Sequence, residues 1–440
     1  MHNPRLTVIG TGYLGTTHAV CMAVLGFEVL GVDVDERKVE LLASGEVPFF
    51  EPGLPELLVK ALESGRLRFT TSYAEAAEFG DVHFICVGTP QQAGSDAADL
   101  TYVDAAFTTL ARHLRRRTLV VGKSTVPVGT AARLIRQVHE LSPVGAQVEL
   151  AWNPEFLREG FAVDDTMNPD RLVFGVQTAW AEERLRAAYA PVIAAGAPVK
   201  VTDLQTAELV KVAANSFLAT KISYINAMAE ICEATGADVH DLAEALAYDD
   251  RIGGRFLKPG LGFGGGCLPK DIRAFTHRAG ELGVGQAVAF LREVDGINQR
   301  RRARTVDLVR ELAGGDLVGV KVAALGAAFK PNSDDIRDAP ALDVATTLQK
   351  AGAIVTVFDP AAMDNARRTY PQLSYGESAF DVARGADVVV LLTEWAEFRQ
   401  IDPGAMGEIV AQRRIVDGRH ALDPAEWRAA GWEYRALGRP

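Results

Sequence analysis

The chain contains 440 residues, of which 48% are hydrophobic and 23% charged, and it carries a formal net charge of −11. This length exceeds one ordinary core and predicts a globular protein of two or three domains. The negative charge argues against general binding to nucleic acids or membrane surfaces. No segment is long and apolar enough to span a bilayer, and a strand begins too close to Met1 for a signal peptide, so we expect a cytoplasmic protein.

The N-terminal part alternates between strand and helix patterns. Residues 5–9 predict a strand, GTGYLG a turn, 16–25 a helix, and 27–35 a second strand. Further strands are predicted within 82–90, 118–127 and 148–154. Because helical patterns separate these strands, we expect an α/β domain with a parallel, doubly wound sheet over residues 1–202.

The pattern becomes helical near Asp203. Apolar residues recur at helical spacing over 203–236 without a proline, which predicts one long helix opening a helical region over 203–310. Strand and turn patterns return after residue 311, where GVKVAALGAAFK, GAIVTVFDP and ADVVVLLTEW resemble segments of the first domain. This weak internal repeat, with Asp359 in place of Asp33, predicts a second Rossmann-like domain over 311–440. The alternative to a true duplication is that any two α/β domains look alike at this level.

The first glycine-rich turn has a dinucleotide-binding pattern. Gly10, Gly12 and Gly15 form GxGxxG between a strand and a helix, and let a pyrophosphate approach the helix N-terminus. Asp33 ends the next strand, where its carboxylate would bond the ribose hydroxyls and repel a 2′-phosphate, so we expect NAD rather than NADP. Lys38 lies near enough to reach the ribose as well. The alternative is a glycine turn that serves packing alone.

Two pairs of polar residues stand four positions apart. Lys211 and Asn215 share one face of the predicted long helix, and a buried lysine is costly unless it is paired or functional. A lysine that extends to solvent is the alternative. Glu155 and Glu159 follow a strand end, where doubly wound sheets bind ligands, although the spacing also fits a solvated helix face. Thr125 is either a site residue or an ordinary strand end.

Cys267 follows an unusual loop. Five glycines within residues 260–266 exclude a helix or a stable strand interior, and let a ligand or another backbone approach closely. A cysteine after such a loop, with Lys270 and Asp271 close behind it, has the setting of an activated nucleophile. We expect the other cysteines to be buried and to act as small apolar side chains. They are Cys21, Cys86 and Cys232. No Cys or His spacing predicts a disulfide framework or a metal site.

Positive side chains near this loop and in the C-terminal half could receive a diphosphate. They are Arg251, Arg255, Lys258, Lys330 and Arg337. Each of them alone also fits an ordinary surface cation.

These motifs together resemble the UDP-glucose/GDP-mannose dehydrogenase family over nearly the whole chain. They occur in family order as VIGTGYLG, VGTP, KSTVPVGT, NPEFLREG, ELVKVAANSFLATKISYINAMAEIC, GFGGGCLPKD and AFKPNSDDIRDAP. The resemblance implies two Rossmann-like domains joined by a long central helix, and a homodimer formed through the middle region. It also implies oxidation of the 6-hydroxymethyl group of a nucleotide sugar to a carboxylate with two NAD.

UDP-glucose is the expected substrate, with TDP-glucose, GDP-mannose or a UDP-N-acetylhexosamine as alternatives. Gly266 departs from the family, which usually has Ser or Ala before the cysteine. Leu268 stands where UDP-glucose enzymes often have Phe and GDP-mannose enzymes often have Leu, whereas NSDDIRDAP is closer to the glucose branch.

The resemblance further implies residue roles. Cys267 adds to an aldehyde intermediate, and the resulting thiohemiacetal is oxidised to a thioester that water hydrolyses. The residues around the reacting carbon are Lys211, Asn215, Asp271, Thr125, Glu155 and Glu159. The NAD-binding residues are Gly10, Gly12, Tyr13, Leu14, Gly15, Asp33, Lys38, Thr89, Pro90, Thr125, Glu159, Lys270 and Arg337. The nucleotide-sugar residues are Glu155, Phe156, Leu157, Arg158, Lys211, Asn215, Phe256, Leu257, Lys258, Pro259, Gly260, Gly264 and Lys330, with Arg251 reaching the neighbouring subunit.

Two other functions remain open at this point. A one-step hydroxyacid dehydrogenase also pairs a Rossmann domain with a long helix bearing Lys and Asn four apart, but it needs neither Cys267 nor a second α/β domain. A non-catalytic NAD-binding or sensor protein has no reason to combine Lys211, Asn215, Cys267 and Asp271.

Overall fold

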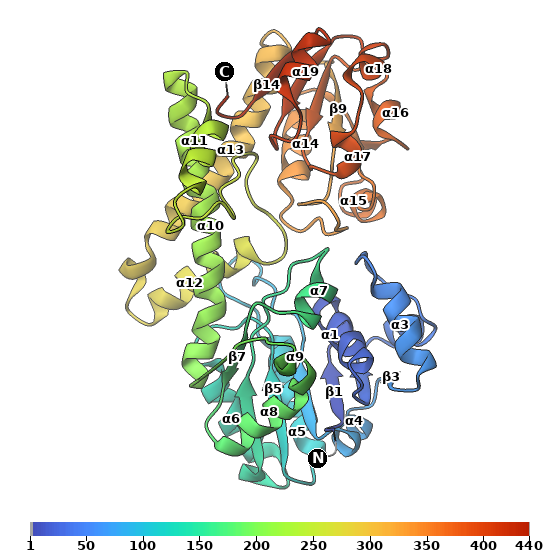
Figure 1. Ribbon diagram of the computed structural model, residues 1–440, viewed down its shortest axis with the longest axis vertical. Helices are drawn as coiled ribbons and strands as arrows, with labels where there is room; N and C mark the ends of the chain where they lie inside the picture. Colours follow the sequence, from blue (N-terminus) through green and yellow to red (C-terminus); the bar gives the residue numbers. More distant parts are fainter. Residues whose placement is uncertain (1–2, 440) are drawn as a thin grey trace. The chain divides into compact units, whose positions relative to one another are not determined.

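The computed structural model describes residues 3–439 (Figure 1). The chain forms two compact units: unit 1 is Met1–Ala214 with His277–Gly283, and unit 2 is Asn215–Thr276 with Val284–Pro440. Helices α10 (Leu204–Thr235) and α12 (Leu268–Glu281) each carry the chain from one unit into the other.

The sheet of unit 1 has the strand order β3-β2-β1-β4-β5-β6-β7-β8. Its strands are β1 (Leu6–Ile9), β2 (Val29–Val32), β3 (Leu67–Thr70), β4 (Val82–Ile85), β5 (Thr118–Gly122), β6 (Val148–Trp152), β7 (Leu172–Gly175) and β8 (Val199–Thr202). Strands β1 to β6 are parallel, as predicted, with Leu6 opposite both Val29 and Val82. The expectation of a wholly parallel sheet is wrong at β7, which runs antiparallel to β6 with Trp152 opposite Gly175.

The reversed strand has a direct consequence for the ligand edge of this sheet. An antiparallel neighbour needs no crossover helix, so the connection can return at the edge where the preceding strand ended. Residues 153–171, which include NPEFLREG, therefore stay at the carboxyl edge of β6. The sequence patterns did not reveal β3, β7 and β8. Two of these strands, β3 and β8, are partly exposed and lie at the two edges of the sheet.

Helices cover both faces of this sheet, as a doubly wound fold requires (Figure 1). One core joins α1 (Tyr13–Val24) and α3 (Leu54–Glu63) to the sheet through residues such as Val20 and Leu58. The other core joins α5 (Thr101–His113) and α6 (Thr130–Leu141) to it through Phe107 and Leu134. The helices of unit 1 are α1 (Tyr13–Val24), α2 (Glu36–Ala43), α3 (Leu54–Glu63), α4 (Tyr73–Phe79), α5 (Thr101–His113), α6 (Thr130–Leu141), α7 (Ala162–Met167), α8 (Ala179–Ala188) and α9 (Ala190–Ala194), with a 3₁₀ turn η1 (Gly145–Gln147).

Unit 2 contains a parallel sheet of order β11-β10-β9-β12-β13-β14, the arrangement that β3-β2-β1-β4-β5-β6 has in unit 1. Its strands are β9 (Lys321–Leu325), β10 (Ile354–Phe358), β11 (Ser374–Tyr375), β12 (Val388–Leu391), β13 (Arg414–Asp417) and β14 (Glu433–Ala436). Asp359 accepts the N–H groups of Ala327 and Ala328, just as Asp33 accepts the N–H of Thr11. The internal repeat predicted from sequence therefore extends to strand order and to this acid–backbone contact.

The helical middle region begins with α10, a 32-residue helix that confirms the predicted long central helix. Its length follows from the absence of proline, and the N–H of Gly236 closes its last turn on Cys232 O at 2.9 Å. The other helices of unit 2 are α11 (Val239–Ala247), α13 (Phe290–Leu312), α14 (Pro340–Lys350), α15 (Met363–Thr369), α16 (Ala379–Ala383), α17 (Ala396–Arg399), α18 (Pro403–Gly407) and α19 (Pro424–Ala429), with a 3₁₀ turn η2 (Gly285–Val288).

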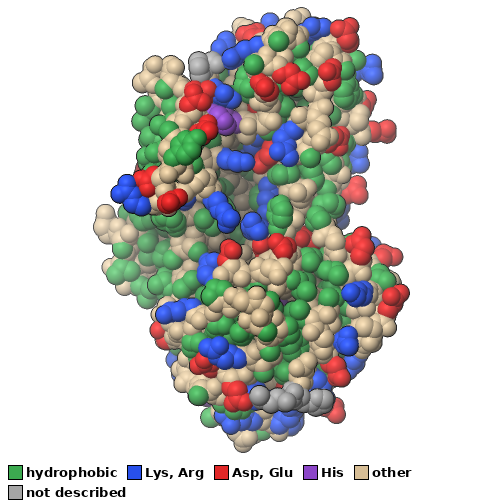
Figure 2. Space-filling view, in the orientation of Figure 1, with side chains coloured by type: hydrophobic (Ala, Val, Ile, Leu, Met, Phe, Trp, Pro, Cys, Tyr) green, Lys and Arg blue, Asp and Glu red, His purple; other side chains and the backbone are tan. Residues whose placement is uncertain are grey.

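Acidic and basic side chains are mixed along the sequence, and they are also mixed on the surface. On the face drawn in Figure 2, acidic and basic side chains are interspersed rather than segregated into fields of one sign. Within residues 3–439, no helix combines the length and hydropathy needed to cross a bilayer.

Candidate active site

The predicted cofactor residues of unit 1 gather at the carboxyl edge of its sheet. The segments following β1, β2, β4, β5 and β6 begin with Gly10, Asp33, Cys86, Lys123 and Asn153. Since these strands are parallel neighbours, all of these segments lie at one edge, where doubly wound sheets bind ligands.

The glycine-rich turn fits a dinucleotide. A Cβ at Gly10 or Gly15 would lie within 3.2 Å of the segment after β4 or of the turn itself, so these two positions are used for packing. Gly12 differs, since a Cβ there would meet open space. Among the described residues no side chain caps the N-terminus of α1. The open backbone at Gly12 thus leaves the positive end of a 12-residue helix for a pyrophosphate.

Asp33 is held as a carboxylate at the end of β2. Its Oδ2 accepts the Thr11 N–H at 2.8 Å and the Thr11 hydroxyl at 2.9 Å, and it pairs with Lys38 Nζ at 3.2 Å. Burial opposes ionisation, but the N–H groups of Asp35 and Thr11, the hydroxyl and Lys38 together keep the pKa of Asp33 below its ordinary value. A buried negative charge at this point favours a free ribose 2′-hydroxyl over a 2′-phosphate.

The loops after β4 and β5 are bonded to each other. The Thr89 hydroxyl donates to Thr125 O at 2.8 Å, and the Ser124 hydroxyl donates to Val87 O at 2.6 Å. Thr89 and Thr125 are therefore neighbours, as their joint assignment to the site requires. Pro90 lies exposed beside them.

Tyr13 joins the glycine turn to the segment after β6 through a residue that the sequence analysis missed. The Tyr13 hydroxyl donates to the buried Glu51, whose two oxygens also accept Gly160 N–H at 2.6 Å and Ala162 N–H at 2.7 Å. Burial and the Glu51 carboxylate raise the pKa of Tyr13, which remains a phenol. Glu51 carried no signal in the sequence, because its partners lie 38 and 109 or more positions away.

Lys211 is buried and paired, so the interpretation of it as a solvent-seeking lysine is wrong. Its Nζ lies 2.9 Å from Glu155 Oε1, and the two side chains are 5% and 12% exposed. The ammonium also lies 5.6 Å from the centre of the Phe156 ring. The second oxygen of Glu155 accepts the Leu157 N–H at 2.6 Å, which orients the carboxylate toward Lys211.

The interpretation of Glu155 and Glu159 as one face of a helix is also wrong. Residues 153–159 are irregular, so the four-residue spacing has no helical meaning there. Pro154 restricts the residue before it and its ring disfavours a helix at this point. Glu159 is half-buried near Tyr13, whereas Arg158 is exposed and pairs with Asp165 at 2.6 Å.

In unit 2, Cys267 lies at the start of α12. Its carbonyl accepts the Asp271 N–H at 3.0 Å, which closes the first turn and places the thiol at the N-terminus of the helix, where the peptide dipoles favour an anionic sulfur. Asp271 is 2% exposed, accepts Asn215 Nδ2 at 2.7 Å and pairs with Lys270 at 2.5 Å. Of the four cysteines, all within the described chain, only Cys267 is exposed.

The other cysteines behave as predicted. All three are buried, and burial raises the pKa of Cys21 and of Cys86 to about 12. These two thiols are therefore poor nucleophiles near neutral pH.

The glycine loop before Cys267 is packed against the protein itself. A Cβ at Gly262 would lie 2.2 Å from Asn298 Oδ1, and one at Gly264 would lie 2.3 Å from Asp338 O. Asn298, from α13, pairs with both backbone groups of Phe263, at 2.8 Å and 2.9 Å. Of the two explanations open from sequence, close approach by the chain itself therefore accounts for Gly262 and Gly264.

Arg337 lies against Gly266. A Cβ at Gly266 would meet the Arg337 guanidinium carbon at 2.3 Å, so Ser or Ala would need that side chain to move. Arg337 pairs with Asp335 at 2.6 Å, and Asp335 also accepts the Gly266 N–H at 3.4 Å. Gly266, where the family usually has Ser or Ala, thus lies in contact with the Arg337–Asp335 ion pair.

The remaining predicted substrate residues divide by exposure. Leu257, Pro259, Gly260 and Gly264 are buried, whereas Phe256 and Lys258 are exposed. Lys330 Nζ lies 5.3 Å from the centre of the Phe329 ring. Arg251 is 90% exposed and pairs with its near neighbour Asp249 at 2.7 Å. Within its own chain, Arg251 therefore forms a local ion pair, with a residue only two positions away.

Arg419 is a second residue that the sequence analysis missed. It follows β13 and donates to Leu392 O at 2.8 Å, Gly262 O at 2.8 Å and Phe329 O at 3.3 Å. It therefore ties the glycine loop to the carboxyl edge of the second sheet. No local pattern marks Arg419, because Gly262 lies 157 positions away.

The sequence matches all three domains of one family. Residues 4–193 match the NAD-binding domain, 205–300 the central domain and 323–424 the UDP-binding domain of the UDP-glucose/GDP-mannose dehydrogenase family. The fold and these matches define an NAD-dependent oxidoreductase with a nucleotide-binding second Rossmann unit. The chain belongs to the UDP-glucose/GDP-mannose dehydrogenase family.

Similar proteins agree over the full length. The chain is 42% identical over 438 residues to a UDP-glucose 6-dehydrogenase of Rhizobium meliloti, covering 99% of this chain and 100% of that one. It is 41% identical over 450 residues to a UDP-glucose 6-dehydrogenase of Pseudomonas aeruginosa, covering 99% and 98%. A solved UDP-glucose dehydrogenase of Pyrobaculum islandicum is 38% identical, with a TM-score of 0.92 and coverage of 100% and 98%.

Replacing Gly262 by alanine should damage the loop more than replacing Gly253. Both glycines have positive φ, +99° and +66°, but only at Gly262 does a Cβ meet a buried atom. Gly253→Ala should cost about 1 kcal/mol of unfolding free energy for its backbone strain, and Gly262→Ala roughly 2–3 kcal/mol more. Equal shifts of the two thermal unfolding midpoints would contradict this packing argument.

Asp33→Ala should relax the choice of cofactor. Loss of the carboxylate removes repulsion of a 2′-phosphate, so the ratio of kcat/KM for NADP to that for NAD should rise, by about tenfold or more. Asp35→Ala is the matched control, because Asp35 is exposed and caps α2. Steady-state kinetics with both cofactors measure the ratio, and a parent protein that uses NAD and NADP equally well would refute the argument.

Proposed function

We propose that this protein is a UDP-glucose 6-dehydrogenase, which oxidises UDP-glucose to UDP-glucuronate in two steps with NAD. The observation that carries the proposal is Cys267, exposed at the N-terminus of α12 one turn before Asp271, whose carboxylate is bonded by Asn215. The full-length similarity to UDP-glucose 6-dehydrogenases supports UDP-glucose over the other nucleotide sugars. The two alternatives, a hydroxyacid dehydrogenase and an NAD sensor, leave the UDP-binding domain unexplained.

The chemistry of the substrate explains why a cysteine is needed. NAD, when bound, supplies the hydride acceptor for both oxidations. After the first oxidation the sugar carries an aldehyde, which has no further hydride to give until a nucleophile adds to it. The sulfur of Cys267 forms a bond to that carbon and gives a thiohemiacetal. Oxidation leaves a thioester, and attack by water breaks its C–S bond, releasing the acid and returning the thiolate.

The remaining polar groups have roles that follow from their charge. Lys211 is a buried cation and Asn215 an amide donor, so both suit stabilisation of the oxyanions formed at the reacting carbon. Asp271 orients Asn215 through the 2.7 Å hydrogen bond. Thr125, Glu155 and Glu159 are assigned to positioning a base or a water.

The binding assignments also belong to the proposal. Residues 1–202 would bind NAD, residues 311–440 the nucleotide, and residues 203–310 would form the central domain. The NAD residues would be those of the glycine turn with Asp33, Lys38, Thr89, Pro90, Thr125, Glu159, Lys270 and Arg337. The nucleotide sugar would contact residues 155–158, 256–260, Gly264 and Lys330. Because NAD and nucleotide sugars are substrates of cytoplasmic metabolism, we place the enzyme in the cytoplasm.

A homodimer forms part of the same proposal. Phe217, Tyr224 and Ile231 stand seven residues apart on α10 and are 67%, 50% and 54% exposed. This spacing makes one apolar stripe of the kind that a second helix covers. Lys221, on the same helix, donates to Ile252 O and Gly253 O at 2.9 and 3.0 Å and so holds the loop that bears Arg251. Arg251 would then be presented to the partner subunit.

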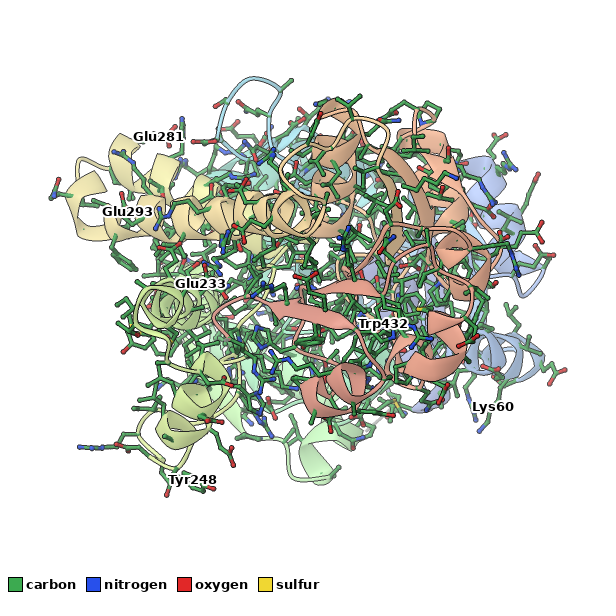
Figure 3. All side chains as sticks on the ribbon, turned by 90° about the horizontal axis from the view of Figure 1, so that it is seen from above. Lys60, Glu233, Tyr248, Glu281, Glu293 and Trp432 are labelled. Atoms are coloured by element: carbon green, nitrogen blue, oxygen red, sulfur yellow. The ribbon has the colours of Figure 1, made fainter. Side chains whose placement is uncertain are left out.

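Figure 3 shows Tyr248, at the end of α11, pointing away from the body of the protein. This side chain is 80% exposed and precedes the Arg251 loop. A second copy of the chain is the occupant that would bury these groups together.

The parent enzyme should release two NADH for each UDP-glucose consumed and no free aldehyde. Cys267→Ala should bind NAD and UDP-glucose but fail at the second oxidation, even when supplied with the 6-aldehyde. Cys267→Ser should stall with the sugar attached, because an ester hydrolyses more slowly than a thioester, and a mass increase on the peptide containing residue 267 would reveal it. Cys232→Ala is the control, since that thiol is buried. Normal acid production by Cys267→Ala would remove this cysteine from the mechanism.

Phe217→Glu should dissociate the dimer by placing a charge within the apolar stripe of α10. Sedimentation velocity at micromolar concentrations measures the change in mass. Val318→Glu is the matched control, because Val318 is 73% exposed but lies outside α10. A parent protein that sediments as a monomer, or a Phe217→Glu variant that remains dimeric, would contradict the proposed interface.

A further inference from the structure

Lys123, the residue after β5, is a buried cation that the proposed mechanism does not use. It is 6% exposed, and within the described chain no carboxylate oxygen lies within 4 Å of its Nζ. Its hydrogen-bond partners are neutral: Asn153 Oδ1 at 3.0 Å and the Tyr189 hydroxyl at 3.1 Å. Burying an ammonium without an ionic partner is costly, so an apolar side chain of similar length would stabilise the fold better.

The contacts of Lys123 form a closed triangle. The Tyr189 hydroxyl donates to Asn153 Oδ1 at 2.6 Å, and Asn153 Nδ2 donates to Val173 O, on β7, at 3.0 Å. The rings of Phe84 and Tyr189 lie 5.9 and 5.7 Å from the ammonium. The triangle thus joins the ends of β5 and β6 to the chain between α8 and α9, and both polar atoms of the Asn153 side chain are engaged.

Two residues of the triangle, Lys123 and Asn153, lie close in the chain to residues assigned to the proposed site. Lys123 precedes Thr125 by two positions, and Asn153 precedes Glu155 by two. Glu155 in turn forms the 2.9 Å ion pair with Lys211. A shift of Asn153 would therefore be transmitted through Pro154, which has little conformational freedom, to the carboxylate of Glu155.

The charged and titratable groups around Lys123 come from several elements. They are His18 on α1, Cys86 after β4, Glu155 after β6, Tyr189 before α9 and Lys211 on α10. Burial lowers the pKa of Lys123, as does the charge of Lys211, whereas Cys86 and Glu155 oppose the decrease. Burial and the nearby Lys123 charge lower the pKa of His18. Lys123 thus interacts with both members of the Glu155–Lys211 pair.

We propose that Lys123 is a positioning residue for the oxidation: through Asn153 and Tyr189 it fixes residues 153–155, so that Glu155 meets Lys211, and it adds a positive charge behind this pair. The inference rests on the proposed function only in that Glu155 and Lys211 act on the substrate. Lys123 itself touches neither the substrate nor the cofactor in this account.

Lys123→Met tests the inference, because it keeps the length of the side chain and removes the amine. The variant should lower kcat by about tenfold while KM for UDP-glucose changes less than about twofold. Both limbs of the pH profile of kcat should move to higher pH, because a nearby positive charge favours proton release from every group around it. Hydrogen exchange of the peptide 153–161 should become faster. Lys60→Met is the control, since Lys60 is an exposed lysine that points to solvent (Figure 3).

The measurements distinguish a purely structural role of Lys123 from a folding defect and from failure of the proposed function. An unchanged kcat, pH profile and exchange rate in Lys123→Met, with only a lower unfolding midpoint, would show a purely structural residue. If Lys123→Met does not fold, Tyr189→Phe tests the inference instead, since it removes one hydroxyl of the triangle. An unchanged kcat and an unchanged hydrogen-exchange rate of residues 153–161 in that variant would overturn the inference. If the parent protein oxidises no nucleotide sugar, the proposed function fails, while hydrogen exchange of 153–161 still tests the positioning role.

Discussion

Helix α10 fixes the spacing along the chain of two polar side chains on which the proposed mechanism depends. It carries Lys211, paired with Glu155, and one turn later Asn215, bonded to Asp271. A turn of α-helix fixes the spacing of two such side chains because each backbone bond restrains the next. A kink or a proline between them would separate the cation from the amide. The unbroken 32-residue helix therefore determines the separation of Lys211 and Asn215 along its axis.

Charge is buried at the ligand edge of unit 1 to an extent that stability alone does not explain. Lys123, Lys211, Glu51 and Glu155 lie close to that edge, each engaged by hydrogen bonds or an ion pair. Their desolvation is expensive, and only complete sets of partners offset it. Such preorganised groups stabilise developing charge without moving, which suits a reaction that passes through successive oxyanions. In the proposed mechanism, these buried charges would therefore serve the reaction rather than the stability of the fold.

The glycine loop shows how a functional position can depend on packing that involves no ligand. Asn298, Asp338 and Arg337 occupy the space that side chains at Gly262, Gly264 and Gly266 would need. Arg419 then donates a hydrogen bond to the carbonyl of Gly262, and Asn298 donates one to the carbonyl of Phe263. The loop is consequently defined before any substrate binds, and it delivers Cys267 to the first turn of α12. Preorganisation of this kind lowers the entropic cost of placing a nucleophile.

The sequence by itself determined the two Rossmann-like units, the long helix, the dinucleotide turn and the distinctive setting of Cys267. These features depend on local order: strand periodicity, the absence of proline from α10, and glycines beside a strand. The tertiary structure decided the partner of Lys211, the reversal of β7, and the contacts of Glu51, Lys123, Asn298 and Arg419. Those features depend on contacts between residues tens to more than a hundred positions apart. No local pattern encodes such contacts, since only folding brings the buried donors and acceptors within bonding distance.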